Sequence, residues 1–201
     1  MITNLIFLIV AYFLGSLPNG LYVAKFKGVN IMEEGSKNTG ATNVFRVLGA
    51  KYGIFVLLLD ALKGYIPLFI ASKLGVNGNG LVLVGLMAVI GHTFSPFLKF
   101  KGGKGVATSL GIFIFLAPLP MLLTLIMFFI VVGISKYVSL GSVLASVMLP
   151  LLILFLPVNK SLNSSTFLFI ISALLGIYII YKHKTNIVRL KNGTENKFYK
   201  K

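Results

Sequence analysis

The chain has no cysteine and no tryptophan, and only four of its 201 residues are acidic. The lack of cysteine excludes disulfides and thiolate chemistry, and its two histidines and few carboxylates show no spacing that suggests a catalytic metal. Charged residues make up 11% of the chain and hydrophobic residues 57%, with a mean hydropathy of +0.94. This composition excludes a soluble globular protein, whose surface carries far more charge. We therefore predict an integral membrane protein without a cofactor or metal.

Long apolar stretches dominate the sequence. A hydrocarbon core roughly 30 Å thick requires about 17 to 25 apolar residues in each spanning helix. Stretches of that kind run over residues 2–24, 53–72, 81–98, 105–135, 138–157 and 166–182. The stretch 105–135 is too long for one span and contains Ala117-Pro118-Leu119-Pro120, so we expect two shorter helices joined by a tight turn. The prediction is an all-α, polytopic membrane helix bundle with about seven transmembrane helices.

The distribution of Lys and Arg predicts the orientation, because cytoplasmic loops accumulate these residues near the ends of spans. With the N-terminus outside and the C-terminus in the cytoplasm, 17 of the 19 cations lie on the cytoplasmic side, and only Lys73 and Lys160 lie outside. Topology and anionic lipid thus account for the net charge of +15, and no nucleic-acid partner is expected. We predict one membrane domain over residues 1–201, with cytoplasmic segments at 27–52, 99–108 and 183–195.

The first polar cluster runs from Gly35 to Arg46 and packs small residues, hydroxyls, amides and two cations into twelve positions. Small residues let backbone N–H groups converge on an oxyanion, while Lys37 and Arg46 supply positive charge. Before it, Gly15-Ser16-Leu17-Pro18-Asn19-Gly20 interrupts the first span. Pro and Gly free backbone groups that need partners, so this segment is either a broken helix beside the site or an ordinary kink.

The second cluster is Gly91-His92-Thr93-Phe94-Ser95-Pro96 followed by Lys99-Phe100-Lys101-Gly102-Gly103-Lys104-Gly105-Val106-Ala107-Thr108. Its Gly-Gly-Lys-Gly core lacks the spacing of a P-loop, and no strand precedes it, so we exclude a nucleotide fold. The remaining prediction is a glycine-rich basic turn that leads into a helix N-terminus, where donors and the helix dipole favour an anion. The alternative is a short basic loop that serves topology alone.

Two further groups of polar residues are less specific. His183 and Asn186 lie three residues apart at the end of the last span, so a continuing helix would place them on one face; the alternative is a solvated, interfacial histidine. Asp60 and Lys63 share the same spacing inside an apolar stretch, where ionisable groups usually pair. That pair is either structural or a substrate contact. The third cluster is the segment from His183 to Glu195. We expect it to share the cytoplasmic side with the first two clusters and to form one phosphate-binding site with them.

Four motifs occur in order along residues 15 to 195, nearly the whole chain: GSxPxG, GSxNxGATNVFR, GH with FKGGKGVAT, and HxxNIxRLxxGTE. Together they resemble the acyl phosphate dependent glycerol-3-phosphate acyltransferase family, the bacterial PlsY type. The resemblance implies transfer of a fatty acyl group from acyl phosphate to the 1-hydroxyl of glycerol 3-phosphate, giving 1-acylglycerol 3-phosphate and phosphate. It also implies a bacterial inner-membrane enzyme whose active site faces the cytoplasm, with a functional link to the enzyme that makes acyl phosphate.

The resemblance also implies roles for individual residues. Ser36 and Arg46 match the catalytic and phosphate-positioning pair, and His183 and Asn186 match the remaining polar catalytic positions, whereas Glu195 matches a structural one. The residues implied to shape the anion pocket or bind substrate are Asn38, Gly40, Thr42, Asn43, Lys101, Gly102, Gly103, Lys104, Gly105, Ser139 and Ser142.

A serine nucleophile needs an adjacent base, and no Ser, His and Asp constellation is visible. Because acyl phosphate is already activated, we expect direct attack by the substrate hydroxyl, with His183 or the substrate's own phosphate taking the proton. Two alternatives remain: a transporter for a phosphorylated solute, since broken helices with glycine turns also bind anions there, and a structural scaffold. The short chain, with polar clusters on one side, argues against transport, and the scaffold leaves the three basic turns unexplained.

Overall fold

The computed structural model describes residues 2–162 and 165–198, and within these ranges every regular element is a helix. The chain divides into two compact units, residues 1–115 and 116–201, which are described separately. The first unit contains α1 (Ile2–Ser16), α2 (Asn19–Phe26), α3 (Ala41–Leu48), α4 (Ala50–Lys73), α5 (Asn79–Thr93), a 3₁₀ turn (Pro96–Leu98) and α6 (Val106–Leu116) up to residue 115. The second contains α7 (Pro118–Ser135), α8 (Val138–Phe155), α9 (Ser165–Lys182) and α10 (Lys184–Lys191).

The described helices confirm a multi-pass membrane protein. Six segments are long and apolar enough to cross a bilayer: Ile2–Phe26, Ala50–Lys73, Asn79–Leu98, Pro118–Ser135, Val138–Phe155 and Ser165–Lys182. Helix α6 is apolar but shorter, so the count of seven crossings and their orientation remain predictions. The long stretch 105–135 divides as expected, because α6 ends at Leu116 and α7 begins at Pro118. Proline suits a first helical position, where its missing N–H removes no helical hydrogen bond.

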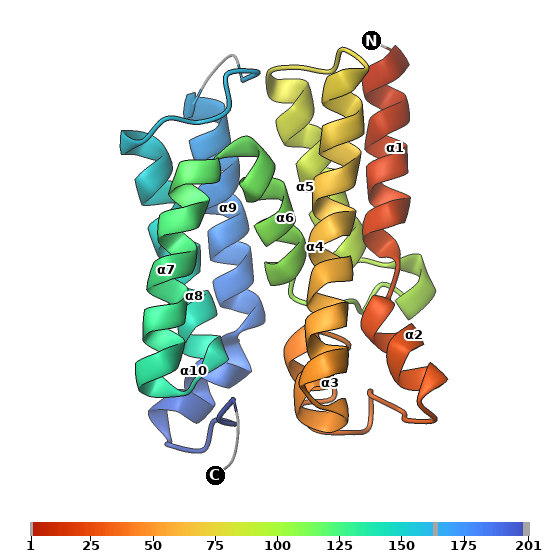
Figure 1. Cartoon of the computed structure of the whole chain (residues 1–201), viewed down its shortest axis with the longest axis vertical. Helices are drawn as coiled ribbons and strands as arrows, with labels where there is room; N and C mark the ends of the chain where they lie inside the picture. The colour runs from red at the N-terminus through yellow and green to blue at the C-terminus, as the bar shows by residue number, and fades with distance from the viewer. Residues whose placement is uncertain (1, 163–164, 199–201) are drawn as a thin grey trace. The chain divides into compact units, whose positions relative to one another are not determined.

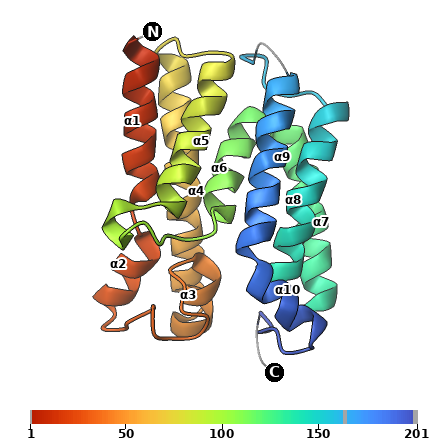
Figure 2. The ribbon, with the colours of Figure 1, turned by 180° about the vertical axis from the view of Figure 1, so that it is seen from behind.

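Small residues bring the helices of the first unit together. Figures 1 and 2 show α1, α4 and α5 side by side. A Cβ atom on Gly15 would overlap the main-chain oxygen of Ala88, and one on Gly91 would overlap that of Tyr12, so α1 and α5 pack backbone to backbone. A Cβ on Gly64 of α4 would likewise overlap the Thr108 oxygen of α6. In lipid, where apolar burial drives association weakly, such close approach supplies much of the helix–helix attraction.

The second unit uses the same packing rule, with α8 contacting both α7 and α9. Gly176 of α9 has no room for a side chain beside the Ser146 oxygen of α8, and Gly141 of α8 lies against the rings and methyls of Phe128 and Val132 of α7. The short helix α10 follows α9 almost directly and contacts α8 and α9.

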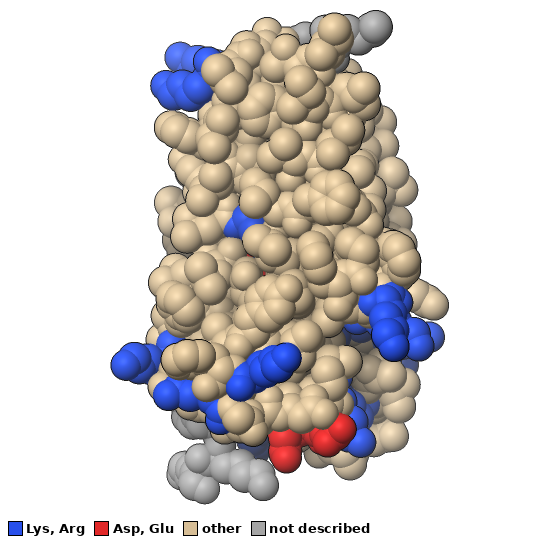
Figure 3. All heavy atoms as spheres, turned by 90° about the vertical axis from the view of Figure 1, so that its right-hand side faces the viewer, with Lys and Arg blue, Asp and Glu red and all other residues tan. Residues whose placement is uncertain are grey.

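The outer surface carries the apolar side chains that a soluble protein would bury. Along α1, large side chains such as Leu5, Ile9 and Phe13 are more than half exposed. Figure 3 shows a broad surface with few charged groups, and Lys and Arg gathered in a band beyond it. An apolar zone flanked by cations is typical of a surface that faces lipid and then the membrane boundary.

Candidate active site

The first span is broken. Helix α1 ends at Ser16 and α2 begins at Asn19, so Leu17 and Pro18 lie outside both helices. Pro18 has no N–H, and the Leu17 carbonyl leaves the helical ladder, which would cost several kcal/mol in hydrocarbon without a partner (about 2–7 kcal/mol per group). Two donors supply that partner: the Asn19 N–H donates to the Leu17 oxygen at 3.0 Å, and Lys63 Nζ of α4 donates to it at 2.8 Å. The segment is therefore a stabilised break rather than an ordinary kink.

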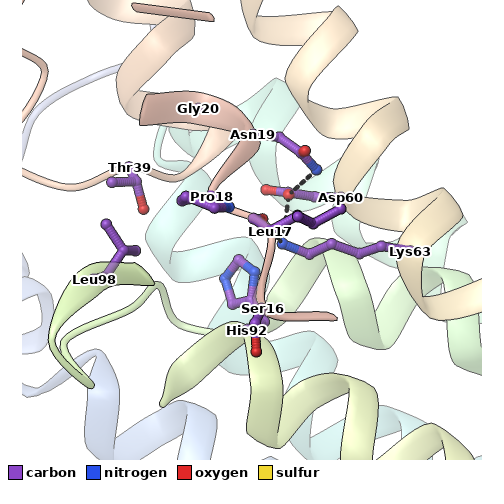
Figure 4. Close-up of a pocket in the computed structure, with 10 residues that line it drawn as sticks. All are labelled: Ser16, Leu17, Pro18, Asn19, Gly20, Thr39, Asp60, Lys63, His92 and Leu98. Atoms are coloured by element: carbon purple, nitrogen blue, oxygen red, sulfur yellow. Dashed lines mark hydrogen bonds and ion pairs between the residues drawn. The ribbon is translucent and has the colours of Figure 1, made fainter. Parts of the chain in front are cut away.

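Asp60 and Lys63 form a buried ion pair next to this break. Lys63 Nζ lies 2.9 Å from Asp60 Oδ1, and the two side chains are 5% and 4% exposed. Asn19, the first residue of α2, donates its Nδ2 hydrogen to the same carboxylate oxygen at 3.0 Å. Figure 4 shows Asn19 from the start of α2 meeting Asp60 and Lys63 from α4 beside the break. The pair thus holds the end of α1 and the start of α2 against α4, which is a structural role.

A small pocket opens at the break and encloses about 200 Å³, part of it open to solvent. It joins the first two sequence clusters, because Thr39 comes from the first and His92 comes from the second (Figure 4). The residues that line it are Ser16, Leu17, Pro18, Asn19, Gly20, Thr39, Asp60, Lys63, His92 and Leu98. Within residues 1–115, two motifs far apart in the chain therefore meet at one place, as expected for them.

The loop of the first motif is organised by the Asn43 side chain, which is 2% exposed. Its Oδ1 accepts the Ser36 N–H at 2.7 Å, and its Nδ2 donates to the Glu34 and Asn38 oxygens at 3.0 and 2.9 Å. Gly35 lacks a side chain where a Cβ would overlap Asn43 Oδ1, and it adopts a left-handed conformation with φ of 57°. Asn43 therefore shapes the loop through the main chain.

The remaining residues of the first motif surround the start of α3. Asn38 Oδ1 accepts the Gly40 N–H at 2.8 Å, and Gly40 occupies the N-cap position of α3. Thr42 lies in the first turn and Arg46 in the last, and both are half-buried, as is Ser36. The loop leans on the broken helix, since a Cβ on Gly20 would overlap the Thr39 oxygen. Ser36, Asn38, Gly40 and Thr42 thus lie within one short stretch of folded loop and helix.

The second motif forms a compact loop between α5 and α6. The Gly102 N–H donates to the Thr93 oxygen at 3.0 Å and the Gly103 N–H to the His92 oxygen at 3.2 Å, so two loop amides cap the end of α5. Figure 2 shows this yellow-green segment crossing beside the break between α1 and α2. The expected helix follows, since α6 begins at Val106 directly after Gly105. Lys101 is exposed and Lys104 is half-buried.

The third motif lies in the second unit, where Glu195 is the centre of a hydrogen-bond network. Ser139 Oγ and Asn186 Nδ2 donate to its Oε1 at 2.9 and 2.7 Å, and Arg189 Nε donates to its Oε2 at 2.7 Å. Burial raises the pKa of the Glu195 carboxyl, but these hydrogen bonds and the Arg189 charge together lower the pKa by more than burial raises it. The pKa therefore lies below the ordinary value. The ionised carboxylate thereby ties the segment after α10 to α8.

His183 and Ser142 also have partners inside the second unit. His183 is 4% exposed and lies between α9 and α10, with Nδ1 2.8 Å from the Ile179 oxygen. Because a carbonyl only accepts, Nδ1 carries a hydrogen, and the basic lone pair of a neutral ring then lies on Nε2. Ser142 Oγ donates to the Val138 oxygen at 2.9 Å. The expected helix is interrupted at His183, which precedes α10, whereas Asn186 lies on α10 itself.

The site residues predicted from the sequence do not include Asn19, Thr39 and His92, and the sequence leaves Asp60 and Lys63 as either a structural pair or a substrate contact. All five line the pocket. The available signal was the coincidence of a Pro-Gly interruption with an ion pair at membrane depth, because a break in lipid needs a polar partner.

Comparisons with known proteins agree with this architecture. The family model for glycerol-3-phosphate acyltransferase matches residues 5–193 of the chain. The chain belongs to the glycerol-3-phosphate acyltransferase family. It is therefore an acyltransferase, and this membership favours the enzyme over the transporter and the scaffold.

Individual relatives of this family are similar over almost their whole length. The glycerol-3-phosphate acyltransferase of Fusobacterium nucleatum is 51% identical over 193 residues, which cover 96% of each chain. That of Geobacter sulfurreducens is 43% identical over 198 residues, covering 98% of this chain and 99% of the relative.

Two crystal structures of PlsY (YgiH), an integral membrane glycerol 3-phosphate acyltransferase, have the same fold. The glycerol 3-phosphate form matches with a TM-score of 0.88 and 40% identity, covering 98% of this chain and 96% of that one. The lysophosphatidic acid form matches with a TM-score of 0.85 and 39% identity, covering 96% and 94%. The all-helical membrane fold of this acyltransferase is thus that of PlsY.

Proposed function

We propose that this acyltransferase takes its acyl group from acyl phosphate and transfers it to the 1-hydroxyl of sn-glycerol 3-phosphate. The products are 1-acyl-sn-glycerol 3-phosphate, which is lysophosphatidic acid, and inorganic phosphate, in the first step of membrane phospholipid synthesis. The observation that carries the proposal is the ordered set of four motifs on a PlsY fold, whose solved relatives are named as glycerol 3-phosphate and lysophosphatidic acid forms.

The chemistry of the motifs suits two phosphorylated substrates. One phosphate must be held to orient the acceptor, and the other must be stabilised as a leaving group. We assign these tasks to Arg46 and Ser36 of the first motif and to Lys104 of the second. Asn38, Gly40, Thr42 and Asn43 shape the loop around the first phosphate, and Lys101, Gly102, Gly103 and Gly105 form the turn that carries Lys104.

The proposed reaction is a direct transfer. The 1-hydroxyl oxygen attacks the acyl carbon, a new ester bond forms, and the bond between the acyl carbon and the phosphate oxygen breaks with phosphate leaving. The hydroxyl proton passes to His183 Nε2 or to the phosphate of glycerol 3-phosphate. The hydrogen on Nδ1, which faces the Ile179 oxygen, supports the first acceptor. Asn186, Ser139 and Ser142 complete the polar surroundings of His183 in this proposal.

We further propose that the enzyme lies in the bacterial cytoplasmic membrane with its active site facing the cytoplasm. The gathering of 17 of the 19 cations on one predicted side supports this orientation. At that interface a water-soluble glycerol 3-phosphate reaches the site from the cytoplasm, and an acyl chain reaches it from the bilayer. A functional link to the enzyme that makes acyl phosphate follows from the donor.

The donor is tested by assaying the purified protein with acyl phosphate, acyl-CoA and acyl carrier protein in parallel. We expect lysophosphatidic acid only with acyl phosphate, with phosphate release that requires both substrates. Turnover with either thioester and none with acyl phosphate would contradict the donor assignment. Direct transfer is tested by mass spectrometry of protein incubated with acyl phosphate alone, where an acyl adduct on Ser36 would contradict it.

A further inference from the structure

The glycine turn of the second motif lies against the end of α5, where it contacts the main chain and the ring of His92. This residue lies in the last turn of α5 and is 8% exposed. Its main-chain oxygen accepts the Gly103 N–H at 3.2 Å, while the neighbouring Thr93 oxygen accepts the Gly102 N–H at 3.0 Å. The two glycines therefore lie directly against the end of α5.

Different groups leave no room for a side chain at the two glycines. A Cβ on Gly102 would overlap the main-chain oxygen of His92, an atom that cannot move without displacing α5. A Cβ on Gly103 would instead overlap the Nε2 atom of the His92 ring and lie 2.9 Å from Cε1 and 3.2 Å from Cδ2. The space at Gly103 is thus set by a side chain, and the space at Gly102 by the backbone.

The start of the turn is held by one side-chain and one main-chain hydrogen bond. Ser95 Oγ donates to the Ser16 oxygen at 2.6 Å, at the end of α1. The Phe100 N–H donates to the Ser95 oxygen at 2.8 Å, and Lys99 and Phe100 both adopt left-handed conformations. The second half of the turn, immediately before Lys104, is held by the two glycine N–H bonds to the end of α5 and lies against the His92 ring.

We infer that His92 is a positioning residue for Lys104: its ring is the surface on which Gly103 rests, and it thereby sets where the Lys104 ammonium meets a phosphate group. The inference rests on the proposed role of Lys104 as a phosphate ligand. It assigns the glycine at position 103 to protein packing, whereas a glycine-rich anion site would need it for close approach of the ligand to the backbone.

A double-mutant cycle distinguishes a glycine required by packing against His92 from a glycine required by close approach of the ligand. Gly103→Ala pushes the turn off the His92 ring, and we expect the KM for glycerol 3-phosphate to rise about tenfold, with a smaller change in kcat, since overpacking at a buried contact typically has effects of this order. His92→Ala removes the ring, so the KM of His92→Ala/Gly103→Ala should return to that of His92→Ala alone. His92→Asn, which keeps a planar polar group, provides a second background should His92→Ala fail to insert.

Gly102→Ala is the matched control, because its clash is with the His92 backbone, which every variant retains. Neither His92 substitution should restore the KM of Gly102→Ala. Equal restoration at both positions, or none at position 103, would overturn the inference. The thermal midpoints of the same proteins in detergent are measured alongside, and the same pattern of recovery is expected.

The thermal midpoints also distinguish the two proposals. If the wild-type protein transfers no acyl group from acyl phosphate, the proposed donor fails. The contact is then judged by stability alone, where recovery of the Gly103→Ala midpoint in the double variant supports the packing and its absence overturns it.

Discussion

The Nζ atom of Lys63 lies 2.8 Å from the main-chain oxygen of Leu17 and 2.9 Å from Asp60 Oδ1. One buried cation thus satisfies both a carboxylate and the carbonyl that the helix break releases. Lys63→Met keeps the aliphatic length but leaves Asp60 unpaired, and breaking a buried pair typically costs about 3–5 kcal/mol of stability. We expect a large fall in the thermal midpoint of the detergent-solubilised protein.

The matched control is Lys63→Met/Asp60→Leu, which removes both charges. Because no buried carboxylate then remains unpaired, the double variant should be more stable than Lys63→Met. A Lys63→Met protein with the midpoint of the wild type would contradict the role of the pair in closing the break.

The first motif loop should open when Asn43 is truncated. Asn43→Ala removes the acceptor of the Ser36 N–H and the donor to the Glu34 and Asn38 oxygens, and a lost buried partner typically costs about 1–3 kcal/mol. Hydrogen exchange over residues 31–38 should accelerate markedly. Asn30→Ala is the control, since Asn30 is exposed and its Oδ1 accepts only a long 3.3 Å bond from Met32 among the described contacts; equal exchange in both variants would argue against Asn43 as the organiser.

Glu195 should make the stability of the protein depend on pH on the acid side. Its pKa is below the ordinary value in the folded state, so its contribution to stability is full above the unfolded pKa of about 4.3 and is lost as the pH falls through the lower folded pKa. The wild-type midpoint should exceed that of Glu195→Gln at neutral pH, and the difference should shrink below about pH 4. A difference that stays constant down to the lowest pH would show that the charge of Glu195 is not what stabilises the network.

Arg46 should be needed for turnover but not for insertion. Because a phosphate ligand that stabilises the transition state is typically worth about 10²–10³ in kcat, Arg46→Ala should lose most activity while the protein still reaches the membrane. Lys73→Ala removes a cation at the predicted outer end of α4 and should leave the rate close to that of the wild type. Near-normal rates in Arg46→Ala would contradict the proposed role of Arg46 as a phosphate ligand.

Activity should survive metal chelators. Acyl phosphate is already activated, and in the proposed site Lys and Arg neutralise the leaving phosphate, so no divalent ion is required for transfer. The assay with acyl phosphate and glycerol 3-phosphate is repeated after extensive treatment with EDTA. Loss of turnover that is restored by one added divalent ion would contradict this expectation.

Much of the architecture was predictable because span length and hydropathy are local properties. The division of residues 105–135 followed from two prolines in one apolar stretch, and α7 begins at Pro118 as expected. The glycine-rich turn predicted a helix directly after it, and that helix begins at Val106. The four ordered motifs were specific enough to indicate the family from the sequence alone.

The sequence was less informative about what each polar residue contacts. Asn43 was predicted to shape an anion pocket, and its bonds run to the main chain of its own loop. Asp60 and Lys63 left two interpretations open; their bonds to Asn19 and Leu17 give them a structural role, and both also line the pocket. Such partners depend on how α1 and α2 lie against α4, which no pattern within α4 encodes.

Composition and motif order were therefore sufficient for the solvent, the helical class and the family, because a run of apolar residues has one stable arrangement in lipid, with its backbone hydrogen bonds inside the helix. Only the tertiary structure decided that Lys63 bonds the Leu17 oxygen at the break and that Gly103 lies against the His92 ring. Both contacts join residues that are separated along the chain, and their geometry is set by the close packing of the helices, which brings several polar groups within reach of one another.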